Sequence, residues 1–353
     1  MRDMIFIDGA QGEGGGQVLR SALALSLVTG LPFRIDRVRA GRPRPGLMRQ
    51  HLTAVDAARR IGNATVVGDG IGSCSVTFTP GSVVPGSYTF AVGTAGSATL
   101  VLQTILPPLM IAAGPSRIVL EGGTHNPWAP PFEFLAHAFL PLVNSLGPTV
   151  TVTLERHGFA PAGGGRFIVD ILPAGRLEPL ICTDRGAIVR QDGRILIANL
   201  PRHVAERERA ALMRLTGWDE SLLRIEEIDA AGPGNAVLLT VESEHVTEVF
   251  TGFGEHGTRA EHVARRVIDE LRRYLAAGVP VGPHLADQLI LPLAIGAARQ
   301  PAKPSVFRTL PLTRHALTHI DVVQSFLGVP IAVRAESRGA VEVRIAGADP
   351  GIV

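Results

Sequence analysis

The chain has 353 residues, which exceeds one ordinary hydrophobic core and predicts two domains or one domain with a large insert. Apolar residues make up 46% and charged residues 19%, a composition that excludes a disordered chain. The formal net charge of +2 is too small to establish nucleic-acid binding by itself.

No apolar run reaches the roughly 18 residues that a membrane-spanning helix needs, and the first residues lack the charged-then-apolar form of a secretory signal. The two cysteines, Cys74 and Cys182, provide neither a disulfide framework nor the spacing of zinc ligands. We therefore expect a cytoplasmic protein that makes no contact with a membrane.

A strand near the N-terminus is expected to run into a glycine-rich turn, residues 9–16, that opens an apolar helix. Closely spaced glycines let backbone N–H groups approach an anion, and the helix N-terminus favours one there. The turn matches neither the Walker pattern nor the Rossmann fingerprint. Within it, Glu13 could either cap the helix or help bind a divalent cation that phosphate also binds.

An arginine-rich segment follows this helix. Guanidinium forks bind phosphate oxygens in pairs, so the segment could face phosphate. A solvated basic loop is the alternative. Its members are Arg34, Arg37, Arg39, Arg42, Arg44 and Arg49.

One structural plan occurs three times along the chain. Each unit has a small-residue turn, an apolar helix with an internal polar residue, a Pro or Gly stop and a strand. A second helix and a β-branched strand follow. The three plans begin near Gly16, Gly96 and His284, and the second helices are expected at residues 47–61, 132–146 and 315–327. Each unit is therefore predicted to be a sheet with two helices on one face, an α+β arrangement.

The spacing of the three units indicates an insertion. The second unit follows the first by about 80 residues, whereas the third follows the second by about 190, and the excess is of domain size. We predict a main repeat domain over residues 1–184 and 279–353 and an inserted domain over residues 185–278.

Within the insert, strands and helices are expected to alternate. Strands are predicted at residues 195–198 and 236–241, and helices at residues 206–215 and 259–275. The last helix is rich in charge, as a helix with one exposed face should be. The pattern predicts a small βαβαβ module.

His315 stands at the start of the third unit's second helix and is a candidate nucleophile. A neutral imidazole can attack the α-phosphorus of a nucleotide to give a phosphoramidate, and a helix N-terminus disfavours the imidazolium form. A structural role is the alternative. His319 lies one turn later, which raises a two-histidine metal site, although no third ligand stands nearby in the sequence.

Two further polar residues stand on apolar helices. Asp287 could cap its helix or contact ribose, phosphate or a cation. Gln103 lies in the apolar run 100–106. Because a buried amide needs hydrogen-bond partners, Gln103 either satisfies backbone groups or contacts a ligand.

Taken together, these motifs resemble the RNA 3′-terminal phosphate cyclase family over essentially the whole chain, insert included. The number of matching segments in one order makes the resemblance specific. It implies three repeats of a two-helix, four-stranded unit with a small thioredoxin-like inserted domain. The matching segments are Asp8-Gly9, residues 12–20, residues 39–42, Pro45-Gly46-Leu47, Gln50-His51, Gly122-Gly123-Thr124, Gly158-Phe159, Pro161, residues 163–165, residues 284–288, and His315 with Thr318.

The resemblance implies a ligase-type enzyme that uses ATP to convert an RNA 3′-phosphate into a 2′,3′-cyclic phosphate. His315 would take AMP from ATP, release pyrophosphate and pass AMP to the RNA 3′-phosphate. The 2′-hydroxyl would then close the ring and expel AMP, helped by its tethered position. RNA with a 3′-phosphate end is the implied partner, and ATP with Mg²⁺ or Mn²⁺ the implied cofactors.

The resemblance also implies roles for individual residues. The adenine would lie between Pro131 and His284, and the cation would be held by Glu13 and Asp287. The implied ATP contacts are Glu13, Arg20, Gln103, Pro131, His284, Leu285, Ala286, Asp287 and Gln288. The implied RNA or phosphate contacts are Arg39, Arg42, Gln50 and His51.

Two positions depart from the family pattern. His284 stands where an aromatic ring is common, which weakens adenine stacking, and His319 stands where Asn is common. Non-catalytic relatives that assist ribosome assembly lack the nucleophilic histidine, so His315 argues against that role. An enolpyruvyl transferase needs a cluster of Lys and Arg, but Lys303 is the only lysine. The sequence leaves open the oligomeric state, with a homodimer among the options, and the role of the insert.

Overall fold

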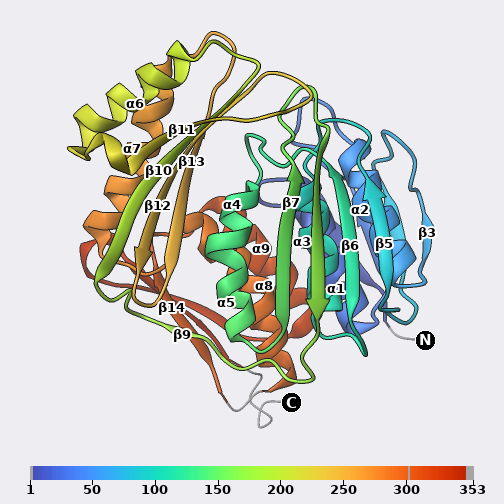
Figure 1. Ribbon diagram of the computed structural model, residues 1–353. Coiled ribbons are helices and arrows are strands. Elements are labelled where there is room, and N and C mark those ends of the chain that lie inside the picture. The colour runs from blue at the N-terminus through green and yellow to red at the C-terminus, as the bar shows by residue number, and fades with distance from the viewer. Residues whose placement is uncertain (1–2, 301–302, 347–353) are drawn as a thin grey trace.

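The computed structural model describes residues 3–300 and 303–346. The outer ends of the predicted main domain, residues 1–2 and 347–353, lie outside the described residues. The described part forms four four-stranded mixed sheets with helices packed against them (Figure 1). The predicted α+β class is confirmed.

The first repeat has the strand order β1-β2-β4-β3. Strands β1 and β2 are parallel because α1 crosses over between them, whereas β4 runs antiparallel to both of its neighbours. Along β2, Phe33 and Ile35 point into the core and Arg34 points to solvent, as the period of a strand requires. The elements are β1 (Ile5–Asp8), α1 (Gly16–Thr29), β2 (Phe33–Asp36), α2 (Arg49–Ile61), β3 (Thr65–Val67) and β4 (Val76–Thr79).

The second repeat has the equivalent order β5-β6-β8-β7, with the same parallel and antiparallel pairs. Its second helix is built from two α-helical pieces joined by a π-helical segment, Leu135–Phe139. The other elements are β5 (Ser87–Ala91), α3 (Ala98–Leu109), β6 (Ser116–Gly122), α4 (Phe132–Phe134), α5 (Leu140–Ser145), β7 (Thr149–Arg156) and β8 (Gly165–Leu172).

The third repeat follows the same plan, with the order β9-β14-β16-β15. The predicted threefold repetition is thus confirmed down to the pairing of its strands. The elements are β9 (Ile181–Cys182), α8 (Pro283–Arg299), β14 (Ser305–Thr309), α9 (Arg314–Leu327), β15 (Ile331–Ala335) and β16 (Val341–Ile345).

Helix α8 does not stop at Pro292, contrary to the expected proline stop, but continues to Arg299. A proline inside a helix removes one backbone hydrogen bond and costs about 3 kcal/mol. The residues around it, Leu291, Leu293 and Ala294, are all buried. Their burial on several faces outweighs the lost hydrogen bond.

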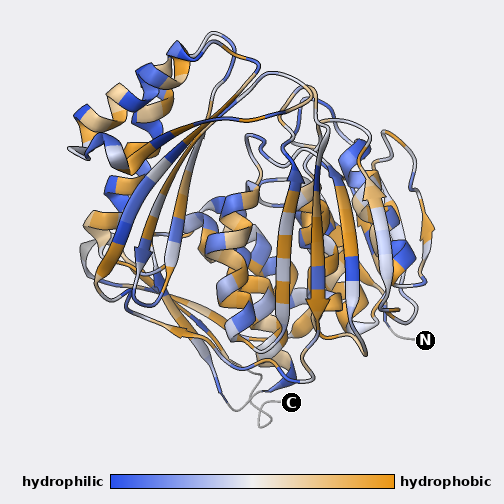
Figure 2. Cartoon of the chain, in the orientation of Figure 1, coloured by the Kyte–Doolittle hydropathy of each residue, from blue (hydrophilic) through white to orange (hydrophobic). Residues whose placement is uncertain are grey.

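The insert lies between β9 and α8, the first strand and first helix of the third repeat. Its sheet has the order β11-β10-β12-β13, and part of its apolar residues form a core cluster of their own, whereas Leu196 and Leu238 belong to the main core. Figure 2 shows hydrophilic residues along α6 and α7, the two helices of the insert. The elements are β10 (Ile188–Ala198), α6 (His203–Thr216), a 3-10 turn (Glu220–Leu222), β11 (Leu223–Glu227), β12 (Gly234–Ser243), β13 (Thr247–Phe253) and α7 (Ala260–Ala277).

The order of elements in the insert differs from the predicted βαβαβ alternation. After α6, three strands follow in succession before α7, and β12 and β13 form an antiparallel hairpin. A hydrogen bond from Ser243 N to Val246 O, 2.9 Å long, closes the turn between them. The domain limits 185–278 remain a prediction.

The first helices of the repeats lie deep in the molecule. Helix α1 packs against α3 and α9, and α9 packs against α8. Every residue of α1 from Gln17 to Leu27 is buried. A helix that is buried all round must satisfy its polar side chains internally. No helix in the described part of the chain has the length and apolar character that crossing a membrane demands.

Candidate active site

The glycine-rich turn presents a free helix N-terminus. Gly15 is the N-cap of α1, no side chain in the described structure caps it, and its first turn holds no acidic residue. Gly12 has a φ of 62°, and a Cβ there would overlap the side chain of Thr318 on α9. The Thr318 hydroxyl accepts a hydrogen bond from Glu13 N, 3.3 Å away. The turn is therefore fixed against α9 and fits a phosphate anion.

His315 lies in the first turn of α9. The helix is capped by the Thr313 hydroxyl, which accepts from Ala316 N at 3.1 Å. The His315 side chain is 35% exposed, and its Nδ1 lies 3.0 Å from Oδ1 of Asp287. Because the carboxylate accepts a hydrogen bond, we assign the proton of the neutral ring to Nδ1. The lone pair on Nε2 is then free to act as a nucleophile.

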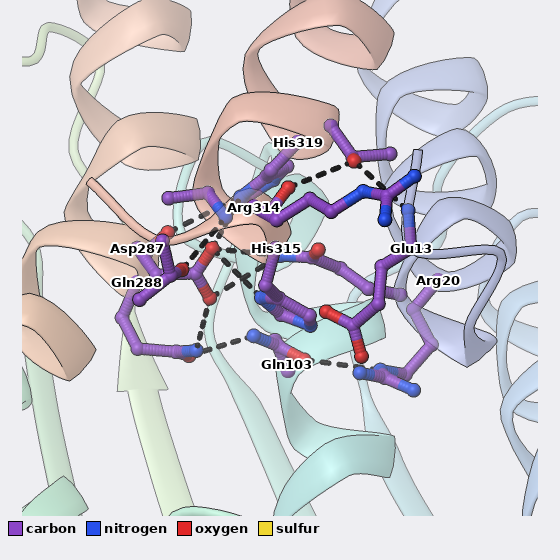
Figure 3. A network of polar contacts seen from close by, with 12 residues as sticks. Glu13, Arg20, Gln103, Asp287, Gln288, Arg314, His315 and His319 are labelled. Carbon is purple, nitrogen blue, oxygen red and sulfur yellow. Dashed lines mark hydrogen bonds and ion pairs between the residues drawn. The ribbon is translucent and has the colours of Figure 1, made fainter. Parts of the chain in front are cut away.

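Asp287 is the centre of the polar network drawn in Figure 3. Gln17 Nε2 donates to both of its carboxylate oxygens, at 3.0 and 3.2 Å. Nδ1 of His319 lies 3.6 Å from Oδ1 and donates to the backbone oxygen at 3.2 Å. Burial raises the pKa of Asp287, but the hydrogen bonds from His315 and His319 outweigh it and hold that pKa well below its ordinary value. Asp287 is therefore anionic.

A chain of hydrogen bonds links the three repeats to this carboxylate. Arg20 Nε donates to Gln103 Oε1 at 3.0 Å, and Gln103 Nε2 donates to Gln288 Oε1 at 2.7 Å. Gln288 Nε2 then donates to Asp287 Oδ2 at 3.3 Å. Burial lowers the pKa of Arg20 to about 10, and the negative charge of Asp287 opposes that shift.

The chain of hydrogen bonds follows the repeat. Arg20, Gln103 and Gln288 lie at equivalent places near the start of α1, α3 and α8. Residues 103–107 and 288–292 share the pattern Gln-x-Ile-Leu-Pro. One residue from each repeat therefore meets the other two where these helices converge, and together they line a small pocket that His319 also lines.

Glu13 and Asp287, the predicted cation ligands, already have partners. Glu13 forms an ion pair with Arg42, and both side chains are partly exposed. The Asp287 oxygens accept from glutamine and histidine donors. A cation bound there would replace some of these contacts, and the roles of both residues in cation binding remain predictions.

Two of the residues predicted to contact RNA form hydrogen bonds with backbone groups in this structure. Arg39 Nη1 donates to the carbonyl oxygens of Arg44 and Gly46, each at 2.8 Å. Gln50 Oε1 accepts from Ser97 N at 3.0 Å, beside the start of α3. Arg39 therefore supports its own loop and Gln50 the start of α3, and their contact with RNA remains a prediction.

His51, another predicted RNA contact, is buried at the start of α2. Its Nδ1 accepts from Met48 N at 3.1 Å. Burial, with repulsion from Arg20 and Arg39, lowers its pKa to about 3. His51 is therefore neutral near pH 7, and its position explains Gly16, where a Cβ would meet the imidazole.

The predicted adenine contacts lie at the starts of α4 and α8. Pro131 is the N-cap of α4, and the preceding carbonyl of Pro130 accepts from the Thr99 hydroxyl at 2.8 Å. His284 is exposed, whereas the side chains of Leu285 and Ala286 are fully buried. Contact of Leu285 and Ala286 with a nucleotide remains a prediction.

Comparison with known proteins identifies the fold and its relatives. A family model described as RNA 3′-terminal phosphate cyclase matches residues 11–333. The chain belongs to this family.

Proteins named RNA 3′-terminal phosphate cyclase match it almost end to end. The Ralstonia nicotianae protein is 50% identical, covering 97% of this chain and 96% of the relative. The Koribacter versatilis protein is 48% identical, covering 96% of this chain and 94% of the relative. The Ectopseudomonas mendocina protein is 48% identical, covering 94% of each. The cyclase family match thus includes the glycine-rich turn, the insert and His315.

Two members of the cyclase site received no role from the sequence. Gln17 donates to both oxygens of Asp287, and Thr318 accepts from the backbone of Glu13. Gln17 carried a detectable signal, since it is a polar residue at the start of a helix whose following residues are apolar. The Thr318 contact joins residues 305 positions apart and depends on the packing of α9 against α1.

Proposed function

We propose that this chain is an ATP-dependent RNA 3′-terminal phosphate cyclase that uses His315 as its nucleophile. The observation that carries the proposal is the 3.0 Å contact between His315 Nδ1 and the buried Asp287 carboxylate. With its Nδ1 proton directed at Asp287, the partly exposed ring would present the Nε2 lone pair beside a free helix N-terminus, in a chain that belongs to the cyclase family.

In the first step, His315 Nε2 attacks the α-phosphorus of ATP. A bond forms between Nε2 and phosphorus, and the bond from that phosphorus to the β-phosphate oxygen breaks, which releases pyrophosphate. The ring becomes positively charged as the new bond forms, and the Asp287 carboxylate stabilises that charge. The uncapped N-terminus of α1 and the guanidinium of Arg20 would bind phosphate oxygens.

In the second step, an oxygen of the RNA 3′-phosphate attacks the same phosphorus, and the Nε2–phosphorus bond breaks to return neutral His315. In the third step, the 2′-hydroxyl attacks the activated 3′-phosphate. It loses its proton, AMP departs and the cyclic phosphate forms. A phosphate monoester is a poor electrophile until it bears a good leaving group, and the tethered hydroxyl gains from proximity.

Mg²⁺ or Mn²⁺ would offset the negative charge of the phosphates when bound, and Glu13 and Asp287 are the proposed ligands. The donor set fits such an ion, because hard divalent cations take carboxylate oxygens. Glu13 forms an ion pair with the exposed guanidinium of Arg42. Binding of the cation by Glu13 would break this pair, and Arg42 is then the proposed contact for a phosphate. The cytoplasm is the proposed compartment, consistent with the free thiols of Cys74 and Cys182.

The experiment uses three short RNAs that differ only at the 3′ end, incubated with ATP and Mg²⁺ or Mn²⁺. The terminal phosphate of an RNA that ends in a ribose 3′-phosphate should become resistant to phosphatase. An RNA with a 2′-deoxy terminal nucleotide should stop at the AMP-capped stage, and an RNA with a 3′-hydroxyl should not react. Cyclisation without ATP, or none with the first RNA, would refute the proposal.

A further inference from the structure

A second cluster of chemically active side chains lies in the second repeat, at its border with the insert. It consists of His125 after β6, Glu133 in α4 and His157 after β7. One ligand atom from each lies within 4.8 Å of the other two. His125 is 1% exposed and Glu133 is 4% exposed. None of the three contacts the His315 network in the described structure, so the proposed nucleotide chemistry leaves the cluster unexplained.

One buried atom of the cluster lacks a hydrogen-bond partner in the described structure. The imidazole Nε2 of His157 is buried and has no hydrogen-bond partner among the residues that the structure describes. Nearby, His125 Nε2 lies 2.6 Å from Glu133 Oε2. The His125 and His157 rings lie 5.1 Å apart between centroids. Buried polar atoms are almost always satisfied, so the orphaned nitrogen indicates a partner between these three side chains.

The remaining atoms of the ligand groups are held in place. His125 Nδ1 lies 2.8 Å from the Thr124 hydroxyl, and Glu133 Oε1 accepts from Arg194 Nη1 at 3.2 Å. Arg194 is in turn bound to Glu226, at 2.7 Å. Metal ligands are typically oriented by such outer contacts.

We propose that His125 Nε2, Glu133 Oε2 and His157 Nε2 bind one zinc ion, with a fourth position open to water. Two imidazoles and one carboxylate are a known type of zinc ligand set. Tetrahedral zinc needs its ligand atoms about 3.3 Å apart, so His125 and Glu133 separate by less than about 1 Å on binding. Binding selects the neutral tautomer of His125 that carries its proton on Nδ1, which donates to the Thr124 hydroxyl and leaves the Nε2 lone pair for the ion.

The position of the ion defines what it does. Two of its ligands, His125 and Glu133, flank the segment that joins β6 to α4, so the ion fixes that segment to the end of β7. Glu133 is also bound to Arg194 of the insert, and His157 pairs through its backbone with Ala230 of the insert. The ion therefore ties the insert to the second repeat. This inference stands independently of the proposed cyclase activity.

The test uses the full chain, stripped with a chelator and then given Zn²⁺ or Co²⁺. We expect about one zinc per chain by elemental analysis, and Co²⁺ should give the strong visible absorption of a tetrahedral site. His157→Phe keeps a ring beside His125 but lacks the ligand nitrogen, so it should retain roughly a tenth of an equivalent or less. His256→Phe, at an exposed histidine, should bind like the parent chain.

Unfolding separates a lost ligand from a lost fold. Zinc should raise the Tm of the parent chain and of His256→Phe but not the Tm of His157→Phe. In chelator, the Tm of His157→Phe should lie close to that of the metal-free parent chain. His157→Gln is the second variant, with the same expectation. No zinc on the parent chain, or equal zinc on the parent and either His157 variant, would show that the cluster is only hydrogen-bonded.

Discussion

Nδ1 of His315 lies 3.0 Å from Oδ1 of Asp287, and Nδ1 of His319 lies 3.6 Å from the same oxygen. One buried carboxylate thus serves two imidazoles that stand one turn apart on α9. The two rings differ in exposure, since the side chain of His315 is 35% exposed and that of His319 is 3% exposed. This asymmetry favours the proposed nucleophilic role of His315 and a supporting role of His319 toward Asp287.

Asp287→Asn should slow the formation of the His315 adduct. The amide keeps the size of the side chain but loses the negative charge that fixes the Nδ1 proton and stabilises the charged ring. We expect the single-turnover rate of AMP transfer to the protein to fall by about 10² or more. Asp170→Asn, at a surface ion pair with Arg117, is the matched control. A rate equal to that of the parent chain would remove Asp287 from the account.

His319→Asn should be milder than His319→Ala. Asparagine can still donate to the Asp287 backbone oxygen, whereas alanine leaves that buried acceptor and a cavity. We expect the rate of AMP transfer to fall by less than about tenfold in His319→Asn and further in His319→Ala, with labelling detectable in both. Loss of all labelling in a folded His319→Asn protein would contradict the supporting role.

Gln103→Leu should destabilise the fold by about 1–3 kcal/mol, because Arg20 Nε loses its acceptor and Gln288 loses its donor in a buried site. Thr104→Val changes the next residue, whose hydroxyl bonds only within its own helix in the described structure, and should cost less. Urea unfolding at constant pH measures both. Equal unfolding free energies for the two variants would show that the hydrogen-bond chain between the repeats contributes nothing.

The unfolding free energy should depend on pH through Glu248, whose carboxylate accepts from Gly282 N at 2.6 Å. Burial raises its pKa to about 8 from the ordinary 4.5. A raised folded-state pKa gives stability that is fully present below about pH 4.5 and is lost as pH rises toward about 8. Glu248→Gln should remove this loss, so it should stabilise the fold more at pH 8 than at pH 5.

The measurement is the unfolding free energy of the parent chain and Glu248→Gln at several values between pH 5 and pH 8. Their difference should widen in favour of the glutamine as pH rises. Curves that stay parallel would mean that Glu248 ionises in the folded state as it does in the unfolded chain.

The sequence predicts the repeats well because their signals are local. The first unit has a glycine turn at residues 12–16, and each unit has an apolar helix that carries an internal polar residue. The structure confirms the same strand order in all three units. The hairpin of β12 and β13 was not predictable in this way, because its turn, Ser243-Glu-His-Val246, contains no glycine, proline or asparagine. In the short strand β11, the apolar alternation is limited to Leu223 and Ile225, which is too brief to predict a strand.

For the site, the sequence identifies His315 and Asp287 as polar residues at helix starts but cannot show that they meet. Their contact depends on α8 packing against α9. The hydrogen bond from Gln17 spans 270 positions in the chain, and the one from Arg20 to Gln103 spans 83. Such contacts arise only when three buried helices converge, and no local pattern encodes that geometry.

The most direct test of the central claim is the covalent adduct itself. The parent chain, His315→Ala and His319→Ala are incubated with ATP labelled at the α-phosphate, with Mg²⁺ or Mn²⁺ and without RNA. The account predicts protein-bound label that is stable to base and lost in acid. The label should be present in the parent chain, reduced but detectable in His319→Ala, and absent from His315→Ala. Label that persists in His315→Ala, or that sits on another residue of the parent chain, would contradict it.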